Sequence, residues 1–182
     1  MYICHYNSSP AFIKISSMFR QEYAHLAIFE GLNPQQIQAL SPFLEEVRYP
    51  SGTVIFQQGN FADALCIVLE GEVQIRYKPY DGPSLVVARI SPGGVCGWSA
   101  ALGRDVYTSS AVANTEVVAY RLKRACLQTL CERNPELGRV WLERLASVIA
   151  ERLRNTHVSI LEMLTASMDL QPSSQGCQNQ EE

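Results

Sequence analysis

The sequence contains no apolar run of the roughly 18 residues that a membrane-spanning helix requires. Its first residues also lack the charged segment and the long apolar segment of a secretory signal peptide. Basic charge is scarce, because 15 lysines and arginines are outnumbered by 18 acidic residues. An acidic chain is a poor candidate for nucleic-acid binding. These absences predict no membrane insertion and no nucleic-acid partner.

The sequence also lacks the signatures of catalysis and of metal binding. It has no P-loop, no Ser–His–Asp set and no paired carboxylates in a suitable glycine context, so we expect no catalytic residue and no enzyme. The six cysteines form no CxxC pair and the three histidines no HxxxH spacing, which predicts no metal site. Cys66 and Cys96 fall in apolar, strand-like runs, where cysteine is most often a small buried hydrophobe. Scattered cysteines of this kind suit a reducing compartment, so we expect a cytoplasmic location.

A helix-start signal opens the structured part of the sequence. Asn33 can cap a helix that begins at Pro34, and Gln36 can close a capping box. The apolar residues that follow share one helical face: Ile37, Leu40 and Leu44. We therefore expect an amphipathic helix that precedes the first strands.

From Val47 onward the pattern changes to short apolar or alternating runs separated by turn residues. Turns containing glycine recur every 11 or 12 residues, at Gly59, Gly71, Gly82 and Gly93. This rhythm is typical of antiparallel strands in a sandwich or barrel. The predicted strands cover residues 53–56, 65–70, 73–78, 85–90, 110–114 and 116–122.

The helical period returns after Leu122, with a break at Asn134-Pro135 and then a long helix over 134–168. Six residues of this helix follow a 3, 4, 3, 4, 3 spacing: Ala146, Ile149, Leu153, Thr156, Ile160 and Met163. This spacing is a heptad seam with one polar interruption, and it predicts a homodimer. The alternative is an apolar stripe that packs on the chain's own β domain.

The two ends of the chain are expected to be loose. Residues 1–22 read as a flexible arm in which Met18 is an alternative start to Met1. Residues 169–182 are polar and poor in aromatics, which predicts a disordered tail.

Three short motifs, "FEGL", "GTVIFQQG" and "LEGEVQI", place glycines at defined turns. With the order helix, strands, two helices, the sequence from about Ile28 to Arg154 resembles the cyclic-nucleotide-binding domain of catabolite-activator and FNR-like regulators. The resemblance implies a mainly β fold with flanking helices, a jelly-roll barrel over residues 23–133. It further implies a regulatory function, with movement of the segment after Leu122 on ligand binding.

The segment "CGWSAALGRDVYTSSAVA" is similar to the family's phosphate-binding cassette. There, amides at a short helix N-terminus and an arginine hold the cyclic phosphate, and a glutamate binds the ribose hydroxyl. Gly97 matches the family's glycine, but Trp98 replaces the glutamate and Tyr107 the arginine, or Thr108 after a shift of one residue. The candidate pocket residues are Gly97, Trp98, Ser99, Ala100, Arg104, Tyr107, Thr108, Ser109 and Ser110.

Both diagnostic residues of the cassette therefore differ, and three interpretations stay open. Arg104 could replace the missing cation. The pocket could take another, uncharged ligand between Trp98 and Tyr107. Trp98 could instead fill the pocket and leave an interaction domain without a ligand.

The predicted function is a stand-alone regulatory or sensor domain that does not bind cAMP or cGMP in the usual way. A cyclic nucleotide or another small ligand is a possible cofactor, and a protein partner is possible. The alternatives are a structural or protein-interaction subunit, and a transcription-regulator relative that lacks its DNA-binding domain.

Overall fold

The computed structural model describes residues 13–16 and 19–169, with side chains described mainly over 19–154. Its elements are β1 (Ile13–Ser16), the 3₁₀ helix η1 (Gln21–Tyr23), α1 (Pro34–Leu40), the 3₁₀ helix η2 (Ser41–Phe43), β2 (Leu44–Tyr49), β3 (Val54–Phe56), β4 (Ala64–Glu70), β5 (Val73–Tyr77), β6 (Leu85–Ile90), β7 (Val95–Cys96), β8 (Ser110–Ala113), β9 (Val117–Lys123), α2 (Arg124–Arg133) and α3 (Pro135–Asp169). The chain divides into two units, Met1–Ile149 and Ala150–Glu182. All strands belong to the first unit, and the described part of the second is the remainder of α3.

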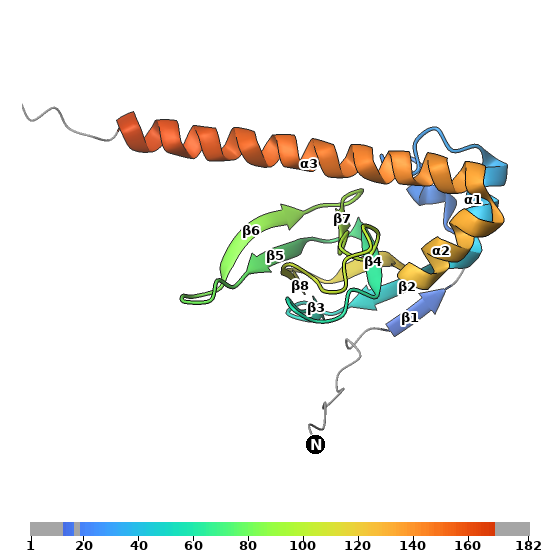
Figure 1. The fold of residues 1–182 in the computed structure, drawn as a ribbon, viewed down its shortest axis with the longest axis horizontal. Coiled ribbons are helices and arrows are strands. Elements are labelled where there is room, and N and C mark those ends of the chain that lie inside the picture. Colours follow the sequence, from blue (N-terminus) through green and yellow to red (C-terminus); the bar gives the residue numbers. More distant parts are fainter. Residues whose placement is uncertain (1–12, 17–18, 170–182) are drawn as a thin grey trace, which may run out of the picture. The chain divides into compact units, whose positions relative to one another are not determined.

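The strands form two antiparallel sheets in the jelly-roll arrangement (Figure 1). The first sheet has the order β1-β2-β9-β4-β7 and the second the order β3-β8-β5-β6. The mainly β fold with flanking helices is confirmed, but the predicted closure into a barrel is wrong. Within the described residues, no strand of one sheet joins the ladder of the other. The interior is enclosed by two stacked sheets and by the chain segments that cross from one sheet to the other, and not by one continuous ladder of hydrogen-bonded strands.

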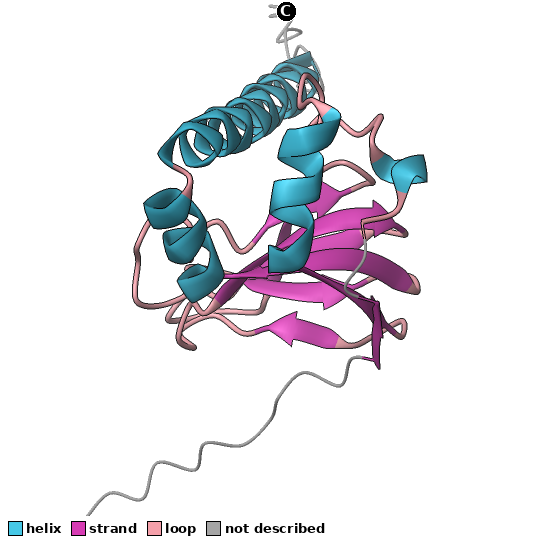
Figure 2. Ribbon diagram, turned by 90° about the vertical axis from the view of Figure 1, so that its right-hand side faces the viewer, coloured by secondary structure: helices cyan, strands magenta, loops and turns pink. Residues whose placement is uncertain are grey.

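The first sheet carries a hydrophobic core on each of its faces. Alternate residues of β4 and β9 point to opposite sides, because strand side chains alternate with a period of two. Leu65, Ile67 and Tyr120 pack under the helices, whereas Val68 and Ala119 face the second sheet. Figure 2 shows α1, α2 and the start of α3 on the helix side, where Trp141 is fully buried.

The predicted first helix is confirmed at its start and is shorter at its end. The Asn33 side chain accepts a hydrogen bond from the Gln36 amide, and the Gln36 side chain accepts one from the Asn33 amide, which completes the capping box. The helix ends at Leu40, and Leu44 begins β2 instead of extending the helical face. Six residues of β2 pair with β9, and this long-range pairing outweighs the local helical spacing.

Part of the expected flexible arm is structured. β1 pairs with β2. Shortly after it, the backbone N–H of Arg20 donates to the Tyr120 hydroxyl at 2.8 Å. The Arg20 guanidinium also pairs with buried Glu46 at 3.2 Å. The remaining residues of the arm, 1–12 and 17–18, and the tail from 170 lie outside the described residues.

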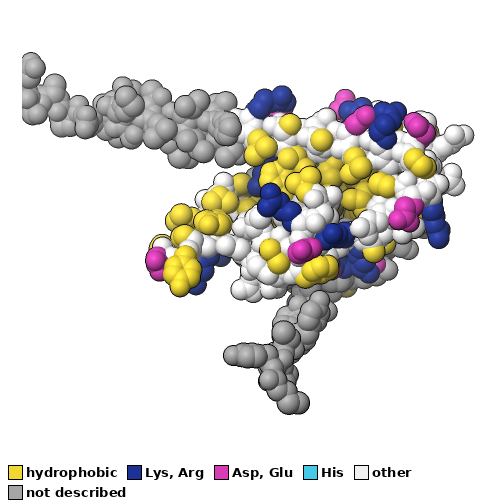
Figure 3. All heavy atoms as spheres, in the orientation of Figure 1, with side chains coloured by type: hydrophobic (Ala, Val, Ile, Leu, Met, Phe, Trp, Pro, Cys, Tyr) yellow, Lys and Arg dark blue, Asp and Glu magenta, His cyan; other side chains and the backbone are white. Residues whose placement is uncertain are grey.

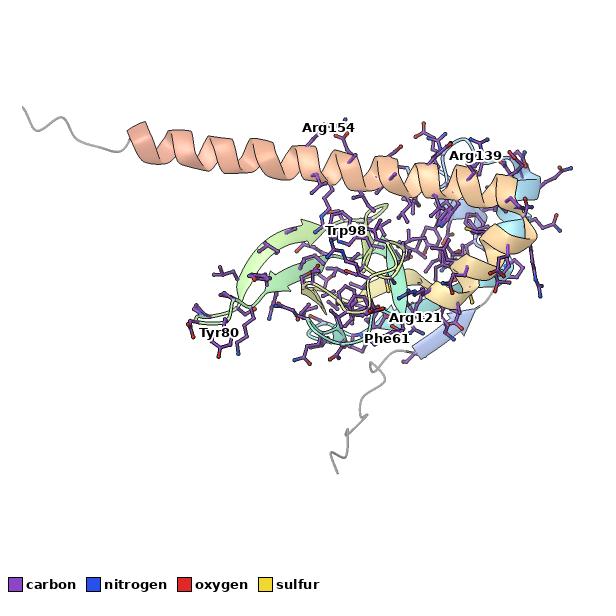
Figure 4. The ribbon with its side chains drawn as sticks, viewed as in Figure 1. Phe61, Tyr80, Trp98, Arg121, Arg139 and Arg154 are labelled. Atoms are coloured by element: carbon purple, nitrogen blue, oxygen red, sulfur yellow. The ribbon has the colours of Figure 1, made fainter. Side chains whose placement is uncertain are left out.

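The β5–β6 hairpin exposes an apolar surface (Figure 3). Five large apolar side chains on it are more than two-fifths exposed: Tyr77, Tyr80, Leu85, Val86 and Val87. Tyr80 lies at the tip of the hairpin (Figure 4) and is fully exposed. Since β6 is the last strand of its sheet, this hairpin also presents an open sheet edge, which favours association.

No helix among the described residues combines the length and the apolar character that a bilayer crossing needs. The same residues contain no group of three or more His, Cys, Asp or Glu side chains placed to hold a metal ion.

We expect Gly71→Ala to destabilise the fold more than Gly52→Ala. Both glycines have a φ of +82°, where an L-residue costs about 1–2 kcal/mol. A Cβ at Gly71 would lie 2.1 Å from the Glu116 carbonyl oxygen, whereas nothing lies within 4 Å of one at Gly52. Urea unfolding of both variants measures the difference, and equal losses would mean that the β4–β5 turn can move away from Glu116.

Candidate functional site

The cassette segment leaves the edge strand β7 and makes one helical turn. The amide of Leu102 donates to the carbonyl of Trp98 at 3.0 Å, and the amide of Arg104 to the carbonyl of Ser99 at 2.9 Å. The resemblance implied a short helix here, and the structure has a single irregular turn over 98–103. The turn begins at Gly97, whose φ is +77°. A Cβ there would lie 2.8 Å from the Ala64 carbonyl oxygen, so only glycine fits.

Tyr107, which the resemblance aligns with the family's arginine, is held in the core between the two sheets. Its hydroxyl lies 2.6 Å from the Ala64 carbonyl oxygen, to which it donates, and accepts from the Ala64 amide at 3.1 Å. Its ring stacks on Phe56 with centroids 4.0 Å apart and planes 16° apart. Only 3% of Tyr107 is exposed. The phenol therefore satisfies buried backbone groups of β4, and Phe56 covers one face of the ring.

The electrostatics of Tyr107 agree with a neutral side chain. Burial raises the pKa of the Tyr107 phenol above its usual value of 10, the Ala64 hydrogen bond opposes that rise, and nearby Asp63 adds to it. A neutral hydroxyl cannot supply the positive charge that an arginine places beside a phosphate.

The other predicted pocket residues fall into a buried, a half-buried and an exposed group. Gly97, Ser99 and Ala100 are buried, whereas Trp98, Ser109 and Ser110 are half-buried. Arg104 and Thr108 are exposed. Of the two aromatic residues of the cassette, Tyr107 and not Trp98 belongs to the core between the sheets. Trp98 lies beside β7 (Figure 4).

Two residues outside the cassette contact both of its ends, and neither is among the predicted pocket residues. Ala64 and Phe56 each lie against Gly97 and also contact Tyr107. Ala64 bonds through its backbone, so its side-chain type carries no signal in the sequence. The sequence predicts a strand that contains Phe56, but its contact with Tyr107 arises only when the two sheets stack.

An ion-pair network extends from Tyr107 along the first sheet. Asp63 lies 3.1 Å from the Tyr107 hydroxyl through Oδ1 and 2.5 Å from an Arg121 nitrogen through Oδ2. Arg121 is also 3.7 Å from Glu45, which pairs with Lys123 at 3.1 Å. Arg121 thus shares its charge with two carboxylates.

Arg124, the first residue of α2, connects the cassette loop to the C-terminal helices. Its guanidinium donates to the carbonyl of Arg104 at 3.2 Å and to that of Gly103 at 3.4 Å. It also lies 3.9 Å from the Asp105 carboxylate. A displacement of the loop over 103–105 therefore acts directly on the start of α2.

The predicted dimer seam is only partly described. Ala146 is exposed and Leu153 is 48% exposed. Ile149 is half-buried and packs against the core beneath the helices. Thr156, Ile160 and Met163 lie on α3, but their side chains are outside the described residues. Leu142, four residues before Ala146, is exposed and extends the same alternating spacing of apolar residues.

We expect Tyr107→Phe to lower the free energy of unfolding by about 1–3 kcal/mol, because it leaves buried Ala64 groups without their partner. The raised pKa makes the folded state hold the phenol proton more tightly than the unfolded state does. Stability from Tyr107 is therefore complete below about pH 10 and falls as pH rises further. Urea unfolding between pH 8 and pH 11 should show a shallower alkaline loss in the variant; an unchanged slope would contradict this account.

Comparisons with known proteins agree with this architecture. The family model for the cyclic nucleotide-binding domain matches residues 46–134. The CRP-like cAMP-activated global transcriptional regulator of Mycobacterium tuberculosis is 31% identical over 141 residues, which cover 78% of this chain and 61% of the regulator. The chain spans about three-fifths of the length of the curated relatives it matches first.

Two solved structures extend the comparison. A cyclic nucleotide-binding domain from Methylobacillus flagellatus superposes with a TM-score of 0.72 at 21% identity and covers 78% of this chain and 83% of that one. A Geobacter metallireducens protein assigned to the cyclic nucleotide-binding proteins is 31% identical, with a TM-score of 0.60, and covers 69% of this chain and 91% of its own. This chain belongs to the cyclic nucleotide-binding domain family, with CRP-like regulators among its relatives.

Proposed function

We propose that this chain is a non-catalytic regulatory or sensor domain whose cassette does not hold cAMP or cGMP through a glutamate and an arginine. The observation that carries the proposal is the placement of Tyr107. The resemblance aligns Tyr107 with the family's arginine, and its phenol bonds to the β4 backbone and stacks on Phe56. An arginine-type contact at this point would first require the Tyr107–Phe56 pair to separate.

The energetic cost of the missing residues supports the same proposal. A charge-assisted hydrogen bond contributes about 1.5–3 kcal/mol, so its loss weakens binding by roughly 10- to 100-fold. The exposed Arg104 is the nearest substitute in the sequence, and its backbone carbonyl is already bonded to Arg124. Trp98 supplies no acceptor for a ribose hydroxyl, because an indole only donates.

The regulatory part of the proposal depends on Arg124. Its bonds to the carbonyls of the cassette loop give a direct mechanical link between that loop and α2. Any event that moves the loop then biases the position of α2, which is the type of helix movement that regulatory domains use as output.

A second candidate function is a protein-interaction subunit without a small ligand, and the β5–β6 hairpin favours it. Five exposed apolar side chains on one hairpin are an unusual cost for a monomer. The exposed Leu142, Ala146 and Leu153 on α3 point to association as well. We propose a homodimer through the α3 seam, in which heptad positions of two helices interdigitate.

The nucleotide proposal is tested by thermal unfolding of the protein, stripped of bound nucleotide, with a millimolar panel of cAMP, cGMP and uncharged nucleosides. A ligand at about 100 times its Kd adds roughly 2.7 kcal/mol, which is a shift of a few degrees for a chain of this size. We expect no such shift with cAMP or cGMP. A shift of several degrees in the wild type would contradict this expectation and would mean that the site binds a cyclic nucleotide without the usual glutamate and arginine.

The double variant Trp98→Glu, Tyr107→Arg provides the matched gain-of-function arm of this experiment. It restores both diagnostic side chains, so we expect it to gain the cAMP shift that the wild type lacks. Tyr107→Met is the control, since it opens the core without adding a charge. If the double variant does not fold, the wild-type panel still decides the question.

The dimer proposal predicts that Leu153→Asp converts the protein from a dimer to a monomer in analytical ultracentrifugation. A charge at an exposed seam position is costly when it must be buried against a second helix. Ser147→Asp, on an exposed position next to the seam, is the control and should leave the dimer intact. A monomeric wild type, or a Leu153→Asp dimer, would place the interface elsewhere.

A further inference from the structure

Four polar or sulfur-bearing side chains form a row across the first sheet, on the face toward the second sheet. Glu45 of β2 is opposite Arg121 of β9, Arg121 is opposite Cys66 of β4, and Cys66 is opposite Cys96 of β7. Residues directly opposite each other in antiparallel strands share one face and lie side by side. The two thiols therefore occupy one end of a row that continues into a guanidinium and a carboxylate.

The backbone places the two cysteines at a distance that a disulfide spans. Opposed residues of antiparallel strands have Cα atoms about 4.5–5.5 Å apart, and disulfides join Cα atoms about 4.4–6.8 Å apart. Both side chains are thiols, and both are buried, with 3% and 1% of the residue exposed. The Cα spacing of the opposed pair is thus within the range that a disulfide spans.

The surroundings of Cys66 favour its thiolate. The Cys96 thiol hydrogen-bonds to the Cys66 sulfur, Arg121 lies next in the row, and the Tyr49 hydroxyl is 3.9 Å from Cys66 Sγ. Together they lower the pKa of Cys66, although burial acts in the opposite direction. Burial raises the pKa of Tyr49, so its hydroxyl keeps its proton and can donate. A thiolate is the nucleophilic form of cysteine.

A small oxidant can reach the pair when β7 opens locally. β7 has two residues, lies at the edge of the sheet and, among the described strands, pairs with β4 alone. Short edge elements open at a lower free energy than the centre of a sheet. Hydrogen peroxide is small enough to enter through such an opening.

We propose that Cys66 and Cys96 are a redox-active dithiol that hydrogen peroxide converts into an intrachain disulfide beneath the cassette. The Cys66 thiolate attacks one peroxide oxygen, the O–O bond breaks, and hydroxide leaves to become water with one proton. The Cys96 sulfur then attacks the sulfenic sulfur of Cys66, and the S–O bond breaks with release of a second water. The dithiol loses two electrons, and the peroxide gains them.

The disulfide has a direct structural consequence for the cassette. Cys96 immediately precedes Gly97, and Ala64, which holds Tyr107, lies two residues before Cys66. A bond between the cysteines fixes β7 to β4 where the cassette begins. Because a cross-link restricts the unfolded chain, we expect the oxidised protein to unfold several degrees above the reduced protein.

The test treats the full reduced chain with increasing hydrogen peroxide, followed by tryptic mapping without reductant. Trypsin releases Cys66 in residues 49–76 and Cys96 in residues 90–104, so their disulfide appears as one linked pair of peptides. We expect this pair at peroxide doses that leave the partly exposed Cys126 and Cys131 as thiols. Dithiothreitol should reverse both the linkage and the rise in unfolding temperature.

Single variants separate the roles of the two sulfurs. In Cys96→Ala we expect dimedone to trap a sulfenic acid on Cys66, whereas in Cys66→Ala we expect Cys96 to stay unmodified. Cys131→Ala is the matched control and should keep the linkage. Oxidation of Cys126 and Cys131 before this pair, or linkage of Cys66 to another cysteine, overturns the proposal. The wild-type dose series decides this even if a variant does not fold.

Discussion

The pairing of β4 with β9 is the interaction on which the rest of this structure depends. Both strands are buried along nearly their whole length, so their backbone groups can find partners only in each other and in the neighbouring strands. One face of this pair carries the helices and the other carries the second sheet. A change that slips the register by one residue would exchange the two cores.

The first residue of β4, Ala64, contacts both ends of the cassette and constrains its geometry. The Ala64 carbonyl accepts a hydrogen bond from the Tyr107 hydroxyl, and the Ala64 amide donates one to it. The same carbonyl leaves room only for a glycine at position 97. The resemblance aligns Tyr107 with the family's arginine, and the structure buries this phenol in a stack with Phe56. The same segment is connected to α2 by the hydrogen bonds that Arg124 donates to the carbonyls of Gly103 and Arg104.

The inner face of the first sheet combines an ion-pair network with a pair of thiols. Arg121 lies between them and has a side chain that is only 12% exposed. It pairs with Asp63, and it is the residue of β9 that lies opposite Cys66 of β4. The arginine that pairs with Glu45 and Asp63 is thus also one of the groups that lower the pKa of Cys66.

Elements with local signals can be predicted from the residues alone: the capping box at Asn33, the glycine turns, six of the nine strands in the described residues and the long helix from Pro135. Capping, positive φ and side-chain period act over a few residues, so a short stretch of sequence contains the whole signal. Long-range packing is what makes Leu44 begin a strand and brings Phe56 to Tyr107 and Cys66 to Cys96. These pairings join residues 30 to 80 positions apart, and their register follows from burial on both faces of one sheet, which no local pattern encodes.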